Sequence, residues 1–229
     1  MMTRLITVLS LIALVLGFSS CKIIKSIHQL KKKHAKVYSY KLGNKAIDYC
    51  PLHHLGKKEF YDDVTRVVTE HKKDGYVVYY EMIRSDFTKD SLLKDTIRRK
   101  ARKLKGFSGS YKENSRGMFK KYIEQPQYKN MGVTDNDVWA DINYLQMINQ
   151  FEKLYGEIRL DSTDMNTPFD VKFNKSEKFT KQQYNNIVID YRNDHLIELI
   201  KESKPNKILV LYGEGHRKNF KQKIKKIKG

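Results

Sequence analysis

The stretch KILVLYGEGH, residues 207–216, decides the fold of this chain. Its first six residues form an aliphatic and aromatic run, which is typical of a strand buried on both faces in the middle of a sheet. Two glycines follow and allow the backbone to turn sharply where the strand ends. The turn leaves Glu214 and His216 at the carboxyl edge of the sheet, where open α/β sheets bind their ligands.

Two earlier strands are predicted to end beside similar polar side chains. A Gly-Asn turn dipeptide at residues 43–44 joins two β-leaning runs into a hairpin, and His53 and His54 follow its second strand. The apolar run at residues 76–80 indicates an interior strand that ends at Glu81. Because an amphipathic helix separates these two strands in the sequence, we expect them to be parallel.

The other segments complete an α/β fold, with a central mixed, partly parallel sheet that is flanked by helices and opened by the hairpin. Residues 107–137 are rich in turn-forming residues and are expected to cover the site, around a short helix at 118–123. Asn143 and Gln146 have the spacing of a capping box. The main helices are predicted at residues 59–73, 93–104, 143–155, 185–203 and 217–228.

The amino terminus has the pattern of an export signal. Arg4 precedes a 14-residue apolar segment at residues 5–18, and two serines then lead to Cys21. This arrangement resembles a bacterial lipobox, which implies cleavage before Cys21 and attachment of lipid to it; the alternative is an uncleaved anchor with an incidental cysteine. The predicted organisation is a lipoprotein signal peptide (1–20), a basic tether (21–36) and a single α/β domain (37–229).

The mature chain is strongly basic. Without residues 1–20 it has 44 basic and 26 acidic residues, a formal net charge of +18. Six lysines lie at residues 22–36 and seven basic residues at 217–228, and neither segment contains an acid. These runs are either drawn to anionic head groups beside the anchor or are solvated faces. The export signal argues against a nucleic-acid partner, and Cys50 alone supports no disulfide framework.

Five segments in order carry a resemblance to a known family: PLHHLGKKEFYDDV, VVYYE, WADIN, IDYRNDHL and KILVLYGEGH. They are similar to the TraB/PrgY/GumN and TIKI group, which is related more distantly to ChaN-like and erythromycin-esterase-like domains. That group has an α/β fold with two G-x-x-H motifs and a glutamate at strand ends, and some members are metal-dependent peptidases. The resemblance matches His216, Glu81 and, with Pro51 in place of the glycine, His54. It matches Asp141 and Arg192 more loosely.

The residue types themselves suit a metal. Two imidazoles and a carboxylate at adjoining strand ends favour manganese, cobalt or zinc, so His54, Glu81 and His216 are the predicted ligands. A water bound to such an ion loses a proton near neutral pH and attacks a carbonyl group. Glu81, Asp141 and Arg192 are the predicted catalytic residues, which manage protons or stabilise charge.

Simpler explanations stay open for the same residues. Adjacent side chains of an extended segment point to opposite sides, so only one of two neighbouring histidines enters the site; the motif spacing favours His54 and leaves His53 to pack elsewhere. A lone histidine at a strand end is often a hydrogen-bonding residue. Glu81 needs a partner if it is buried, and Arg84 or Arg192 would supply it as a structural ion pair.

Three classes of function follow. The leading prediction is a cell-envelope lipoprotein that hydrolyses peptide or amide bonds with a divalent metal, acting on a peptide or protein substrate. The alternative is a non-catalytic, lipid-anchored binding protein with a degenerate site. The third class is a basic surface module for anionic polymers or membranes. The membrane is the expected partner in the first two classes, through lipid at Cys21.

Overall fold

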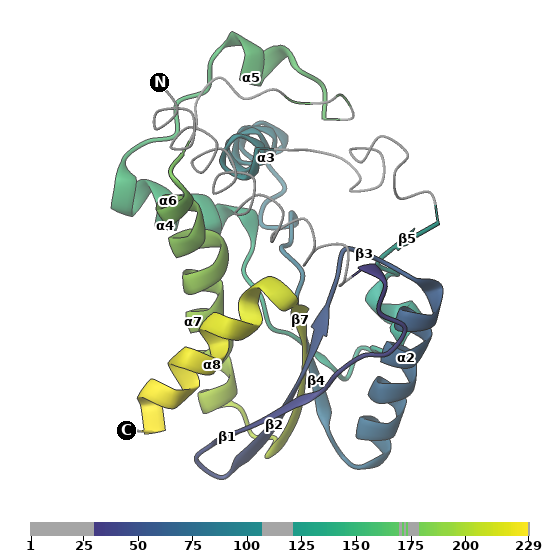
Figure 1. Ribbon diagram of the computed structural model, residues 1–229. Coiled ribbons are helices and arrows are strands. Elements are labelled where there is room, and N and C mark those ends of the chain that lie inside the picture. The colour runs from purple at the N-terminus through teal and green to yellow at the C-terminus, as the bar shows by residue number, and fades with distance from the viewer. Residues whose placement is uncertain (1–29, 107–120, 170, 172, 174–178, 229) are drawn as a thin grey trace, which may run out of the picture.

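A computed structural model describes residues 30–106, 121–169, 171, 173 and 179–228, and Figure 1 shows its arrangement. The centre is a five-stranded sheet of order β1-β2-β7-β4-β6. The strands β1 and β2 are antiparallel, whereas β2, β7, β4 and β6 are mutually parallel. This confirms the predicted α/β class, with a mixed sheet opened by a hairpin. The strands are β1 Tyr38–Leu42, β2 Lys45–Leu52, β4 Val77–Tyr80, β6 Val138–Trp139 and β7 Lys207–Gly213.

The central position of β7 follows from its uninterrupted apolar sequence. Residues 208–212 are each fully buried, because β2 and β4 pair with both edges and helices cover both faces. Alternate side chains of β7 point to opposite faces of the sheet. Val210 and Tyr212 therefore belong to one apolar cluster, and Leu209 and Leu211 belong to another. A polar residue within this run would face a core on either side.

Helices cover the two faces of the sheet (Figure 1). The helix α2 (Lys58–Lys73) packs one face with Phe60, Val64 and Val68. The helices α7 (Arg192–Glu202) and α8 (Glu214–Lys228) pack the other face, where Phe220 and Ile224 of α8 belong to the apolar cluster. The chain is thus a three-layer arrangement of helix, sheet and helices.

A further group of helices lies beyond the carboxyl edge of the sheet (Figure 1). The helices α3 (Ser91–Lys105) and α4 (Tyr144–Tyr155) form a third apolar cluster of their own, and α5 (Ser162–Asn166) lies beside them. The helix α4 begins with the predicted capping box of Asn143 and Gln146 and ends at Gly156. A short two-stranded sheet, β3 (Leu55–Gly56) with β5 (Ile123–Glu124), lies near the same edge.

Three segments differ from their predicted form. Ile123 lies in β5, where the end of a short helix was expected, and residues 107–120 lie outside the described part of the chain. The helix expected at 185–203 starts earlier, as α6 (Lys181–Asn185), and passes through a π-helical segment (Asn186–Tyr191) into α7. The last helix begins at Glu214, so that His216 lies in its first turn.

The predicted signal peptide, Cys21 and the first part of the basic tether precede the described residues. Within the described ranges, no helix has the length and apolar content needed to cross a bilayer.

Candidate functional site

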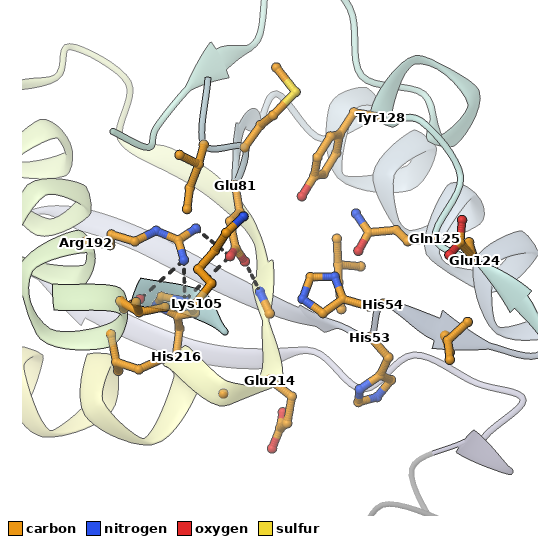
Figure 2. A pocket seen from close by; sticks show the side chains of 18 of the residues that line it. His53, His54, Glu81, Lys105, Glu124, Gln125, Tyr128, Arg192, Glu214 and His216 are labelled. Atoms are coloured by element: carbon orange, nitrogen blue, oxygen red, sulfur yellow. Dashed lines mark hydrogen bonds and ion pairs between the residues drawn. The ribbon is translucent and has the colours of Figure 1, made fainter. Parts of the chain in front are cut away.

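The three predicted strand ends meet at one edge of the sheet because β2, β7 and β4 are adjacent and parallel. Glu81 follows β4, His53 and His54 follow β2, and His216 comes shortly after β7. Figure 2 shows that the side chains of Glu81, Arg192 and His216 gather on one side of the resulting pocket, with His54 opposite them. The sequence therefore identified residues that lie around a common space although they are far apart in the chain.

Glu81 is held by the strand beside it and by a helix. The backbone N–H of Gly213 donates to Glu81 Oε2, and Arg192 Nη2 donates to Oε1 at 2.6 Å. A Cβ atom at position 213 would lie 3.1 Å from Oε2, so the glycine permits this close approach. Burial alone would raise the pKa of Glu81, but Arg192 and the Gly213 N–H outweigh it and bring the pKa to about 2. Glu81 is therefore a carboxylate at neutral pH.

Arg192 is the centre of the cluster. Its Nε donates to Asp141 Oδ1 at 2.9 Å and its Nη2 to Asp141 Oδ2 at 2.6 Å, the bidentate arrangement that a guanidinium favours. Its Nη1 donates to the Val188 carbonyl at 3.3 Å and approaches His216 Nε2 at 3.1 Å. With the bond to Glu81, all five N–H groups of the guanidinium have acceptors within the protein.

The ion pairs decide the charge of Arg192. Burial would lower its pKa, but Glu81 and Asp141 outweigh that effect and raise the pKa well above its usual value. Glu81 therefore pairs with Arg192, and the other predicted partner, Arg84, instead lies over the ring of Trp139 at 4.2 Å. The π-helical segment directly before Arg192 supplies the Val188 carbonyl that helps to orient the guanidinium.

His216 is a neutral member of the cluster. Burial lowers its pKa to about 4, so its approach to Glu81 Oε1 at 3.5 Å is not an ion pair at neutral pH. Because Nε2 faces an N–H of Arg192, the proton of the ring lies on Nδ1, which is 3.1 Å from Asn193 Oδ1. Asn193 is fully buried and also donates to the His216 carbonyl and to Asn219. Asn193 therefore fixes the tautomer of His216, a role that its position in the sequence did not indicate.

The two adjacent histidines point in different directions. The ring of His54 is directed into the pocket in Figure 2, whereas the ring of His53 is turned away from Glu81 and lies 5.1 Å from Phe60, centre to centre. Burial lowers the pKa of His54, with Glu81 acting in the opposite direction. His54 is therefore neutral at neutral pH and able to accept a proton.

These residues border a cavity of about 1050 Å³. Side chains that the sequence analysis did not single out also line it, among them Lys105, Gln125, Tyr128, Tyr144 and Tyr184. Gln125 and Tyr128 belong to the segment that was expected to cover the site, which is the signal that pointed toward them. Burial raises the pKa of Tyr128, so that its phenol keeps its proton and can donate a hydrogen bond.

Two of the predicted metal ligands contact a cation of the protein itself. Glu81 Oε1 and His216 Nε2 both face Arg192, at 2.6 and 3.1 Å, and a divalent ion shared by them would lie against that cation. Within the described residues, no group of three or more histidine, cysteine, aspartate or glutamate side chains is arranged to hold a metal. Glu81 and Asp141 each form an ion pair with the Arg192 guanidinium, so the metal site stays a prediction.

Comparisons with protein-family models, with curated proteins and with solved structures find no match for this chain. The resemblance to the TraB/PrgY/GumN and TIKI group therefore stays a prediction that rests on the five sequence segments.

Proposed function

We propose that this protein is a hydrolase of peptide or amide bonds in the cell envelope, anchored through lipid at Cys21. The observation that carries the proposal is the position of His54. A neutral imidazole faces a cavity large enough for a peptide segment, across from the buried carboxylate of Glu81. A base and a fixed negative charge on opposite sides of one cavity suit the removal of a proton from water.

His54 acts as the general base in this proposal. It takes a proton from a water molecule as the water attacks the carbonyl carbon, and it gives the proton to the departing amine. The negative charge of Glu81 favours the protonated imidazole that forms on the way, since the same charge raises the pKa of His54. Tyr128 and Lys105 border the cavity and provide donors for the carbonyl oxygen as its charge develops.

Arg192 and Asp141 act through Glu81 in this scheme. Every N–H of Arg192 already has a protein acceptor, so the guanidinium has none left for a substrate. Its part is to keep Glu81 ionised and in place, and Asp141 holds Arg192 in turn. These two residues are positioning residues, whereas His54 and Tyr128 are the groups that contact the substrate.

The divalent metal stays a separate prediction, and the proton transfers above do not use it. Calorimetric titration of the wild-type protein and of His54→Ala, Glu81→Ala and His216→Ala with manganese, cobalt and zinc tests it. The metal-dependent form of the proposal requires that wild type bind one of these ions more tightly than each variant does. If all four proteins bound these ions equally, the metal prediction would fail and the cation at Glu81 and His216 would be the Arg192 guanidinium.

The activity test uses purified full-length protein in neutral detergent and a library of fluorescence-quenched peptides. We expect His54→Gln to lower the rate by about 10²- to 10⁴-fold, the usual contribution of a general base. His53→Gln is the matched control. His53 also borders the cavity, but its ring lies by Phe60 and is turned away from Glu81, so this variant should keep most of the activity. Wild-type protein without turnover, or equal loss in both variants, would contradict the proposal.

A second candidate function is a lipid-anchored binding protein with the same pocket. The specific observation in its favour is that Arg192 is fully engaged within the protein, which leaves the cluster without a free donor for a reacting carbonyl. This candidate predicts saturable peptide binding without cleavage. Calorimetry with library peptides, followed by mass analysis of the recovered peptide, distinguishes the two functions.

A further inference from the structure

A second cavity lies in a groove between β1 and α8, lined by a set of residues distinct from that of the candidate site. It has a volume of about 750 Å³, and β1 is an edge strand of the sheet. Cationic and aromatic side chains dominate its lining, and no acidic residue takes part. Its aromatic and cationic side chains are Tyr38, Tyr40, Lys41, Arg217, Lys221 and Lys225. We refer to this feature as the β1–α8 groove.

The cations of the groove are arranged by the way α8 packs. Phe220 and Ile224 of α8 are buried in the apolar cluster over the sheet, which leaves Lys221 and Lys225 exposed on the next stripe of the helix. These two lysines are one helical turn apart and therefore present their ammonium groups on the same side of the helix. The helix buries an apolar stripe and brings two cations to one groove.

The ammonium groups of Lys221 and Lys225 are available to bind an anionic ligand. Within the described residues neither lysine forms a salt bridge, whereas Lys223, on another side of the helix, lies 2.6 Å from Asp194. Arg217 contacts the Tyr38 ring at 4.0 Å and is paired with Glu214 at 2.8 Å. The groove is thus a positively charged hollow with aromatic walls, which fits an anionic group attached to an amphipathic body.

We propose that the β1–α8 groove binds the phosphate head group of an anionic phospholipid. The position of β1 in the chain favours a lipid, because Val37, where the groove begins, is only 16 positions after Cys21. Such a segment reaches at most about 55 Å when extended, which keeps the groove near a bilayer if Cys21 is acylated. Tyrosine side chains also favour the interface between head groups and acyl chains. The proximity of the groove to a bilayer depends on the predicted lipidation, whereas the charge of the groove does not.

The experiment is native mass spectrometry of the full-length protein in neutral detergent, with phosphatidylglycerol or phosphatidylcholine added. We expect wild type to retain phosphatidylglycerol in preference to phosphatidylcholine. A lysine near an anionic surface contributes about 1 kcal/mol, so Lys221→Ala/Lys225→Ala should bind phosphatidylglycerol roughly 30-fold more weakly. The matched control is Lys73→Ala/Lys153→Ala, which removes two exposed lysines from α2 and α4.

Several outcomes would overturn the proposal. Equal loss of phosphatidylglycerol in both double variants would show that only net charge matters. Equal retention of phosphatidylcholine and phosphatidylglycerol by wild type would show that the groove does not recognise an anionic head group. Tighter binding of inorganic phosphate or of a soluble polyanion than of phosphatidylglycerol would assign the groove to a different ligand. Repeating the measurement on Cys21→Ala separates the groove from the anchor, because the preference should persist without the acyl chains.

Discussion

Replacement of Arg192 by methionine tests whether a guanidinium organises the site. The change keeps a long side chain and removes the cation that contacts Glu81 at 2.6 Å and Asp141 at 2.6 and 2.9 Å. Asp141 is 1% exposed, so it cannot recover its hydration without opening the structure. Removing one partner of a buried ion pair costs about 3 to 5 kcal/mol. For a chain of this size we expect a melting temperature lower by roughly 10 °C.

The loss of unfolding free energy caused by Arg192→Met should become smaller as the pH falls. The Arg192 charge keeps the pKa of Glu81 near 2, and without it burial raises that pKa. As the pH falls from neutral, Glu81 of the variant takes up a proton, which removes one of the two unpaired charges, while Glu81 of wild type stays ionised. The difference in unfolding free energy between the two proteins should therefore narrow in mild acid.

The assay is urea denaturation followed by circular dichroism at about pH 7 and about pH 5. Arg84→Met is the matched control, because Arg84 stacks on Trp139 and is not part of the cluster. A triple variant with Glu81→Gln and Asp141→Asn added should recover part of the stability, since no unpaired charge is left. An unfolding free energy of Arg192→Met within about 1 kcal/mol of the wild-type value would refute the reasoning. A metal chelator that destabilises wild type by as much as the substitution does would also refute it.

Three further predictions follow from single contacts. His216 should contribute a fall of up to about 3 kcal/mol in the unfolding free energy between about pH 6.5 and pH 4, because it has a folded pKa of about 4 and takes its proton more readily when unfolded; His216→Gln should remove this share and leave that of His53. Asn193→Ala should cost about 1 to 3 kcal/mol and change the tautomer of His216, which nitrogen NMR of the ring reports. Cys21→Ala should abolish incorporation of a fatty-acid analogue in cells, and equal labelling of wild type and variant would contradict the lipoprotein prediction.

The fold could be predicted where the local sequence pattern of a segment matches the environment of that segment in the folded protein. The apolar run of β7 required burial on both faces, and only an interior strand supplies it. The bounds of α4 were fixed by Asn143, Gln146 and Gly156, since a capping box and a glycine satisfy the free backbone groups at the two ends. Segments without such signals, such as β3 and β5, depend on pairing with each other and were not found.

The convergence of the strand-end residues could be predicted, but the contacts among their side chains could not. Parallel strands bring their carboxyl ends together whatever their side chains are, so Glu81 and His216 were placed correctly by topology. The partner of Glu81 depends on which arginine reaches it. Arg84 is nearer in the sequence but lies on Trp139, whereas Arg192 reaches Glu81 from across the fold. A pattern in the sequence reports which face a residue occupies and not which group it meets there.

The charge of the cluster connects its structure with the proposed chemistry. Glu81 and Asp141 both form ion pairs with the single guanidinium of Arg192, and His216 is neutral, so the group carries one net negative charge. Water is largely excluded from that charge, since the Asp141 side chain is 0% exposed and that of Arg192 is 4% exposed. The field of the cluster therefore extends into the cavity that His54 faces and favours a cation there. A protonated His54 is such a cation, and it forms when the imidazole removes a proton from water.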